Sequence, residues 1–128
     1  MEKTKKILIV DDEADMRTLL AVRLEISNFE VIEAKDGEEG LEKAKKEKPD
    51  LIVLDLMMPK ISGFEVCRML KFDDNFKAIP IIVLSALGEQ HEKDKAVQCG
   101  ADAYFIKPFD LSLLITKIES LLKIPHLT

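Results

Sequence analysis

The chain carries five short runs of apolar residues, and a longer stretch with helical periodicity separates each run from the next. The runs are KILIV (6–10), FEVI (29–32), LIVL (51–54), IPIIVL (79–84) and AYFI (103–106). Three of them are continuous, which is typical of strands that are buried on both faces. Strands that alternate with helices five times predict an α/β fold: a doubly wound, five-stranded parallel sheet with helices on both faces.

Two of the helices have local start signals. Asp36 with Glu39, and Ser62 with Glu65, have the spacing of a capping box, in which the first side chain accepts a hydrogen bond from a free backbone N–H group of the first helical turn. We therefore expect helices to begin just after Asp36 and just after Ser62.

The last two predicted helices differ in how firmly they can pack. The fourth, roughly residues 89–99, has only Ala96, Val97 and Cys99 as apolar anchors, so we expect it to be loosely held and to open at low cost. The last helix has one continuous apolar stripe, and we expect Pro125 to end this helix. The stripe consists of Leu111, Leu114, Ile115, Ile118, Leu121 and Leu122.

The length and charge of the chain limit its organisation and its partners. Its 128 residues suit one domain, with a core at about residues 5–123 and a tail or the start of a linker at 124–128. The net charge of -5 and the pI near 5.1 provide no attraction for phosphate backbones, so we expect no direct contact with nucleic acid. No apolar run approaches the length of a membrane span or signal-peptide core, which predicts a cytoplasmic protein without membrane contact.

The two cysteines, Cys67 and Cys99, stand singly in helical patterns. There is no Cys-x-x-Cys motif and no clustered histidine, so a zinc site is not supported. We interpret both as reduced packing residues.

Polar side chains stand at the C-terminal ends of four predicted strands. They are Asp11, Asp12, Asp55, Ser85 and Lys107. In an open parallel sheet these ends share one edge, and a ligand crevice forms there where the strand order reverses. Three carboxylates brought together repel one another, and one of them is driven to protonate unless a cation lies among them. Oxygen ligands without Cys or His favour Mg²⁺.

The remaining two groups extend this chemistry. Lys107 supplies a positive charge and Ser85 a hydroxyl donor for oxygen atoms that arrive on an acidic acceptor. The set predicts phosphoryl transfer to a carboxylate, in which catalysis consists mainly of positioning and charge neutralisation.

Taken singly, each of these residues also has an ordinary structural explanation. Asp12 could cap the first helix together with Asp15, and Asp55 could simply start a loop. Ser85 could be a turn hydroxyl, and Lys107 a solvated charge. Their joint arrangement, each at its own strand end, is what favours a site.

Four short motifs resemble the receiver domain of bacterial-type response regulators in two-component signalling. They are DDE at 11–13, LDLMMP at 54–59, the pair Ser85-Ala86 and KPF at 107–109. The resemblance covers about residues 5–123, and four motifs in this order are far more specific than any one of them. It implies a single flavodoxin-like domain with five βα units.

The resemblance also implies a role for each acidic residue. Asp55 is expected to be the phosphoacceptor, which receives its phosphoryl group from the phosphohistidine of a histidine kinase. Asp12 and Asp55 are expected to bind Mg²⁺ directly, with Mn²⁺ as a substitute. Asp11 would help through a water molecule, and the main-chain carbonyl group of Met57 would complete the protein ligands.

The same resemblance implies how the signal travels. Lys107 is expected to pair with the phosphoryl oxygens, and its peptide bond to Pro108 is expected to be cis. Ser85 is expected to move into a hydrogen bond with one of these oxygens. Tyr104 matches an aromatic switch position, although it could be an ordinary strand aromatic. Phosphorylation would then shift the face formed by helix 4, strand 5 and helix 5, and so control a partner or an output domain.

Two departures from the family pattern lead to hypotheses of our own. Met57 and Leu87, at the positions that flank the phosphoryl group, have apolar side chains that cannot orient an attacking water molecule. We therefore expect slow self-dephosphorylation. As the resemblance implies, we expect the chain to be no enzyme but a phosphoacceptor that assists its own phosphorylation and slow dephosphorylation. Leu113 lies off the stripe of the last helix, and together with Leu111 it suggests a contact surface for a phosphorylation-dependent homodimer or a downstream partner.

Three other functions suit the sequence less well. A phosphatase with an aspartate nucleophile normally needs a second acid two residues further on, where this chain has Met57. A flavodoxin-like carrier of nucleotide or flavin would need a glycine-rich loop after the first strand, where Asp11 and Asp12 would instead repel a phosphate. A receiver domain that serves only as a fixed scaffold would not need all five site residues.

Overall fold

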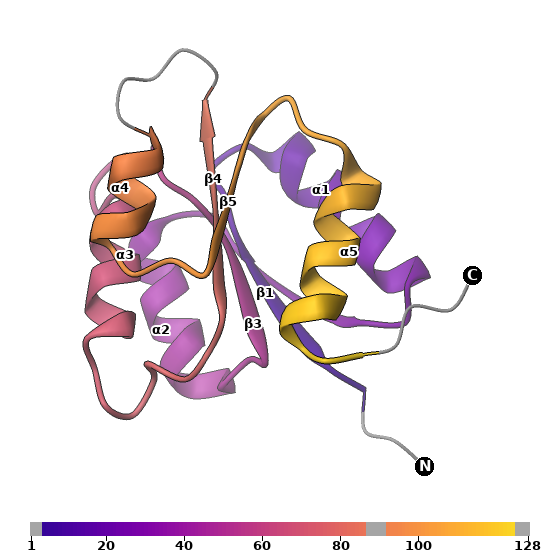
Figure 1. The fold of residues 1–128 in the computed structure, drawn as a ribbon, viewed down its shortest axis with the longest axis horizontal. Helices are drawn as coiled ribbons and strands as arrows, with labels where there is room; N and C mark the ends of the chain where they lie inside the picture. The colour runs from indigo at the N-terminus through magenta and orange to yellow at the C-terminus, as the bar shows by residue number, and fades with distance from the viewer. Residues whose placement is uncertain (1–3, 87–91, 125–128) are drawn as a thin grey trace.

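The structure is a computed structural model that describes residues 4–86 and 92–124 (Figure 1). In this part of the chain, strands and helices alternate from beginning to end. The elements are β1 (Lys6–Val10), α1 (Ala14–Ile26), β2 (Glu30–Ala34), α2 (Gly37–Glu47), β3 (Leu51–Asp55), α3 (Gly63–Lys71), β4 (Ile81–Ala86), α4 (Glu92–Gln98), β5 (Ala103–Lys107) and α5 (Leu111–Leu121). All neighbouring strands pair in parallel, in the order β2-β1-β3-β4-β5, which confirms the predicted fold class.

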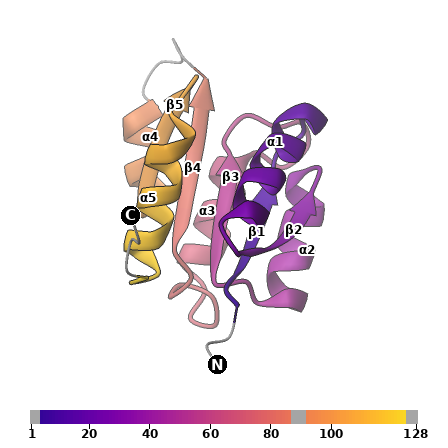
Figure 2. The same cartoon turned by 90° about the vertical axis from the view of Figure 1, so that its right-hand side faces the viewer.

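Helices cover both faces of the sheet. Figures 1 and 2 show α1 and α5 on one face and α2, α3 and α4 on the other. Strand β1 contributes to both layers, because Ile7 and Ile9 pack in the core under α1 and α5, whereas Leu8 and Val10 pack in the core on the other face. Successive side chains of a strand point to opposite faces, so a strand covered on both sides must be apolar at every position.

The capping signals in the sequence are confirmed. Asp36 Oδ1 accepts a hydrogen bond of 2.8 Å from the backbone N–H group of Glu39, and Ser62 Oγ accepts one of 3.2 Å from that of Glu65. The alternative role of Asp12 as a helix cap is wrong, because α1 begins after Glu13, one residue later than such a cap requires.

Helix α4 is held by two small side chains. Ala96 and Cys99 are buried, but Val97, which we expected to be a third anchor, is 70% exposed. Residues 96 and 99 are three positions apart and share one face of the helix, whereas residue 97 points about a quarter turn away from it.

The apolar stripe of α5 is confirmed except at its proposed end. Leu114, Ile115 and Ile118 are buried, and Leu111, Leu121 and Leu122 pack against the same core. The expectation that Pro125 ends this helix is wrong, because α5 already ends at Leu121 and Lys123 has a left-handed backbone with a φ of 59°; Pro125 itself lies outside the described residues. Within the described part, no helix is both long enough and apolar enough to cross a membrane.

The pairing of the strands brings the C-terminal ends of β1, β3, β4 and β5 to one edge of the sheet. Asp55 pairs with Leu84, and Ser85 with Ile106. The start of α3 lies directly against this edge, because Gly63 donates its N–H group to the Leu56 carbonyl oxygen at 2.9 Å. A Cβ atom on Gly63 would overlap the main-chain oxygen of Asp55, so only glycine fits this close approach.

Candidate phosphoacceptor and metal site

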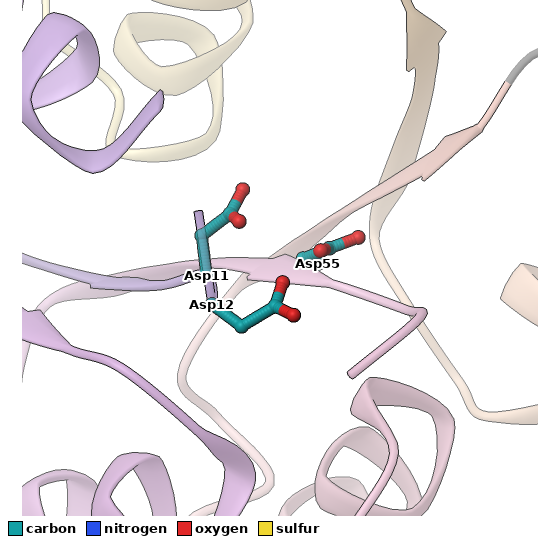
Figure 3. A group of neighbouring side chains, drawn as sticks. All are labelled: Asp11, Asp12 and Asp55. Carbon is teal, nitrogen blue, oxygen red and sulfur yellow. The ribbon is translucent and has the colours of Figure 1, made fainter. Parts of the chain in front are cut away.

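Three carboxylates meet at this edge of the sheet. Asp11 and Asp12 directly follow β1, and Asp55 ends β3, next to β1 in the sheet. One oxygen atom of each side chain lies within 4.8 Å of the others, and Figure 3 shows how the three side chains gather there. Asp11 and Asp55 are buried, whereas Asp12 is exposed and forms the solvent side of the cluster.

Asp55 lies in an environment that opposes its negative charge. Burial and the neighbouring carboxylate of Asp11 raise its pKa from 3.8 to about 7, although Lys107 and the N–H group of Met57 act in the opposite direction. The Met57 N–H group donates to Asp55 Oδ1 at 3.3 Å. A carboxylate with so few compensating contacts has much to gain from a cation.

Lys107 connects three acidic side chains. Its Nζ atom lies 3.2 Å from Asp11 Oδ2, 3.4 Å from Glu13 Oε1 and 3.7 Å from Asp55 Oδ2. Burial alone would lower the pKa of Lys107, but the carboxylates of Asp55 and Asp11 outweigh this effect and raise it. The ammonium group therefore stays charged at neutral pH. The peptide bond from Lys107 to Pro108 is cis, as predicted.

Ser85 brings a hydroxyl group to the same edge. Its side chain is 1% exposed, and within the described part of the chain its Oγ atom has no hydrogen-bond partner. A buried hydroxyl without a partner is costly, and a catalytic role or a bound water molecule or ion is among the reasons for which native proteins keep such a group. Ser85 is therefore suited to donate to an oxygen atom of a ligand at this edge.

Two residues of the site were missed in the sequence. Glu13 pairs with Lys107, and Arg17 Nη1 donates to the main-chain oxygen of Asp11 at 2.7 Å while its Nε atom lies 3.5 Å from Glu33 Oε1. Glu13 stands next to the aspartate pair, which is a weak local signal. Nothing local in the sequence links Arg17 to β2, because that contact exists only once α1 has packed beside the strand.

The structure also gives the positions of Tyr104 and Met57, whose predicted roles stay predictions. Tyr104 lies on β5 and is 36% exposed, and its neighbours Ala103 and Phe105 both pack in the core under α1 and α5. The Met57 side chain is exposed, and the role of its carbonyl group as a ligand stays a prediction. Leu87 lies outside the described residues.

The donor set fits a hard divalent cation. The three clustered groups are all carboxylates, which are the ligands that Mg²⁺ takes from proteins. Burial and the Asp11 carboxylate raise the pKa of Asp55, so a cation beside Asp55 would favour its charged form. With the exposed side of the cluster open to water, a cation there could keep several of its water ligands, as Mg²⁺ usually does.

Known proteins and a known domain family resemble this chain over most of its length. A family model described as the response regulator receiver domain matches residues 7–119. The alkaline phosphatase synthesis transcriptional regulatory protein PhoP of Bacillus subtilis is 46% identical over 119 residues, which are 93% of this chain and 49% of that protein. The DNA-binding dual master transcriptional regulator RpaA of Synechocystis is 40% identical over 118 residues, 92% of this chain and 49% of that protein. This chain thus spans about half the length of these curated relatives.

Solved structures share the whole fold. The chemotaxis protein CheY4 of Vibrio cholerae has a TM-score of 0.85 and 30% sequence identity, and the match covers 93% of this chain and 99% of that one. A CheY-like receiver domain protein from Methanospirillum hungatei has a TM-score of 0.87 and 28% identity, with 94% and 95% covered.

Proposed function

This chain belongs to the response regulator receiver domain family, and from this membership we propose that it is a phosphorylation-activated switch of a two-component system. In the proposal, Asp55 accepts a phosphoryl group from the phosphohistidine of a histidine kinase. The observation that carries it is the convergence on Asp55: two further carboxylates lie within 4.8 Å and the Lys107 ammonium group lies at 3.7 Å.

The transfer needs an ionised nucleophile. A carboxylate oxygen of Asp55 attacks the phosphorus atom, the P–N bond breaks, and the histidine ring keeps the electron pair and takes up a proton. The pKa of Asp55 is about 7 even with Lys107 beside it, so further positive charge at the site would favour the ionised form. Lys107 also lies close enough to contact the phosphoryl oxygens once they are on Asp55.

A bound Mg²⁺ ion, or Mn²⁺ in its place, would neutralise the phosphoryl oxygens during transfer. Asp12 and Asp55 would hold it directly, Asp11 through water, and the Met57 carbonyl group would complete the protein ligands. Asp11 also keeps Lys107 in position through their 3.2 Å ion pair.

The output of the switch is proposed to lie on the face of α4, β5 and α5. Ser85 donates a hydrogen bond from its hydroxyl group to the phosphoryl group, and Tyr104, on the neighbouring strand, then turns inward and shifts this face.

Because the relatives are transcriptional regulators of about twice the length, we place a transcriptional output domain or partner protein downstream. Leu113, which is 60% exposed on α5, is proposed to form part of a homodimer contact in the phosphorylated state.

The domain itself is proposed to be no enzyme toward other substrates. Its phosphoryl group would be lost slowly, because the Met57 side chain beside the site has no polar atom to orient an attacking water molecule. We also propose that the protein acts in the cytoplasm, together with the kinase.

The test is chemical labelling of Asp55. We expect incubation with acetyl phosphate and Mg²⁺ to add the mass of one phosphoryl group to the intact protein, and peptide mapping to locate it on Asp55. The Asp55→Asn variant is the matched control and should not be labelled. Equal labelling of that variant, or turnover of p-nitrophenyl phosphate by the wild type, would reject the proposal, the latter in favour of a phosphatase.

A further inference from the structure

The two cysteines of the chain meet in the core between α3 and α4. Cys67 lies in α3 and Cys99 directly follows α4, and both side chains are fully buried. Cys67 Sγ lies 3.3 Å from the main-chain oxygen of Cys99, and Cys99 Sγ lies 3.3 Å from that of Ala96. The helices lie side by side in Figure 1.

The main chain also approaches α3 closely at this point. Gly100 has a positive φ of 83°, and a Cβ atom placed on it would lie 3.2 Å from the Cβ atom of Lys71 in α3. Cys67 and Lys71 are one helical turn apart, and Cys99 precedes Gly100. The two cysteine backbones are thus brought together at the same contact between the helices.

We propose that Cys67 and Cys99 are a modification site, at which hydrogen peroxide or a related hydroperoxide drives formation of a reversible intramolecular disulfide that clamps α4 to α3. The proposal goes beyond the interpretation of the cysteines as packing residues. It does not require the phosphorylation proposed for Asp55.

The environment of the pair assigns the order of reaction. The Cys99 thiol and burial raise the pKa of Cys67, whereas the hydrogen bond from the Cys67 thiol lowers that of Cys99. Cys99 directly follows the less firmly held helix, because in and directly after α4 the structure shows only Ala96 and Cys99 as buried among the side chains it describes. Cys99 is therefore the sulfur atom that meets the oxidant first, and the directions of the two pKa shifts agree with this order. Local opening of α4 would expose Cys99 without opening the sheet.

The reaction balances with one peroxide molecule. The Cys99 sulfur atom attacks a peroxide oxygen, the O–O bond breaks, and water leaves with the thiol proton, which produces a sulfenic acid. The Cys67 sulfur atom then attacks the Cys99 sulfur atom, the S–O bond breaks, and a second water molecule carries away the Cys67 thiol proton. The two sulfur atoms lose two electrons in total, and the two peroxide oxygens gain them.

Intact mass under non-reducing conditions tests the bond. After treatment of the wild type with hydrogen peroxide, we expect a loss of two hydrogen atoms that dithiothreitol reverses, and a peptide map that joins the segments of Cys67 and Cys99. The Cys67→Ala and Cys99→Ala variants should not show this loss. An unchanged mass, oxygen added to one cysteine without a link, or a disulfide-linked dimer would each overturn the proposal.

Amide hydrogen exchange of the wild type tests the clamp without any substitution in the core. Oxidation should slow exchange in α4 by about tenfold or more, and dithiothreitol should restore the original rate, because the bond opposes local opening. Unchanged exchange in α4 of an oxidised sample would overturn the proposal that the disulfide holds α4 against α3. The Asp55→Asn variant should form the disulfide as the wild type does, which separates this proposal from the proposed phosphorylation.

Discussion

The Nζ atom of Lys107, at the end of β5, lies 3.7 Å from the Oδ2 atom of Asp55, at the end of β3, with β4 between the two strands. The contact is possible because the lysine side chain is long enough to reach across the end of β4. It places a permanent positive charge beside a carboxylate whose pKa is raised to about 7.

Loss of the Lys107 charge should slow phosphorylation of Asp55. We expect the Lys107→Ala variant to be labelled by acetyl phosphate about 10- to 100-fold more slowly than the wild type, because one charge that stabilises the transferring phosphoryl group is missing. Time courses of intact mass measure the rate. Lys77→Ala, which removes an exposed lysine paired only with Asp74 among the described contacts, is the matched control and should label at the wild-type rate. Equal rates in both variants would contradict a role for Lys107.

Binding of Mg²⁺ should weaken as the pH falls. A proton on Asp55 competes with the ion, and the pKa of this group is about 7, so affinity should be nearly constant above pH 8 and fall by roughly tenfold per pH unit below pH 6. Titration calorimetry at a series of pH values measures this. The Asp55→Asn variant should bind more weakly and lose most of the pH dependence. An affinity that stays flat from pH 8 to pH 5.5 would show that Asp55 does not take part.

The stability of the metal-free protein should change with pH in the same range. The folded-state pKa of Asp55 is raised from 3.8 to about 7, so the folded protein binds this proton more tightly than the unfolded chain does. The contribution of Asp55 to the free energy of unfolding is therefore fully present below pH 4, is lost as the pH rises toward 7, and changes little above that.

Replacement of the buried Asp55 carboxylate by a neutral amide should remove the loss of folding stability that occurs as the pH rises. In the presence of a chelator at pH 8, we expect Asp55→Asn to raise the free energy of unfolding by about 2 kcal/mol, and to have a much smaller effect at pH 4. Urea denaturation at both pH values measures the difference. A gain at pH 4 as large as that at pH 8 would point to improved packing instead of relief of charge.

Arg17 should help to position Asp11 in the metal site. Its hydrogen bond to the main-chain oxygen of Asp11 holds the end of β1, so we expect Arg17→Ala to lower the affinity for Mg²⁺ by about tenfold, as is common for residues that orient metal ligands. Calorimetry at pH 8 provides the measurement. Arg23→Ala, in the last turn of the same helix, is the control and should bind Mg²⁺ normally. If both variants bind as the wild type does, the hydrogen bond has no positioning role.

The side chain at position 57 should set the lifetime of the phosphoryl group. Met57 is exposed beside Asp55, and a Met57→Asn variant would place an amide where it can orient a water molecule. We expect its phosphoryl group to be lost several-fold faster than that of the wild type, since positioned hydrogen-bonding groups assist such attack. The decay of the phosphorylated mass after removal of acetyl phosphate measures the lifetime, with Met57→Leu as an apolar control. A lifetime unchanged in the asparagine variant would reject the explanation.

The sequence alone was sufficient to predict the layers of the fold and the edge at which the site lies. Continuous apolar runs such as KILIV can be buried only between two layers of helices, and parallel strands necessarily bring their C-terminal ends to one edge. The second strand was predicted one residue early, because Phe29 packs in the core although β2 begins at Glu30. The capping side chains of Asp36 and Ser62 were predicted correctly because they act within one turn of the backbone.

Only the tertiary structure decided how strongly the site residues interact and what lies around them. Val97 was wrongly expected to be buried because the rotation of α4 about its axis depends on how it packs against α3 and the sheet. The pairing of Glu13 with Lys107, the support of Asp11 by Arg17 and the approach of Cys67 to Cys99 all join groups far apart or on different elements. Their distances, and the burial that raises the pKa of Asp55, arise from packing of the whole domain, whereas strand and cap patterns are local properties of the chain.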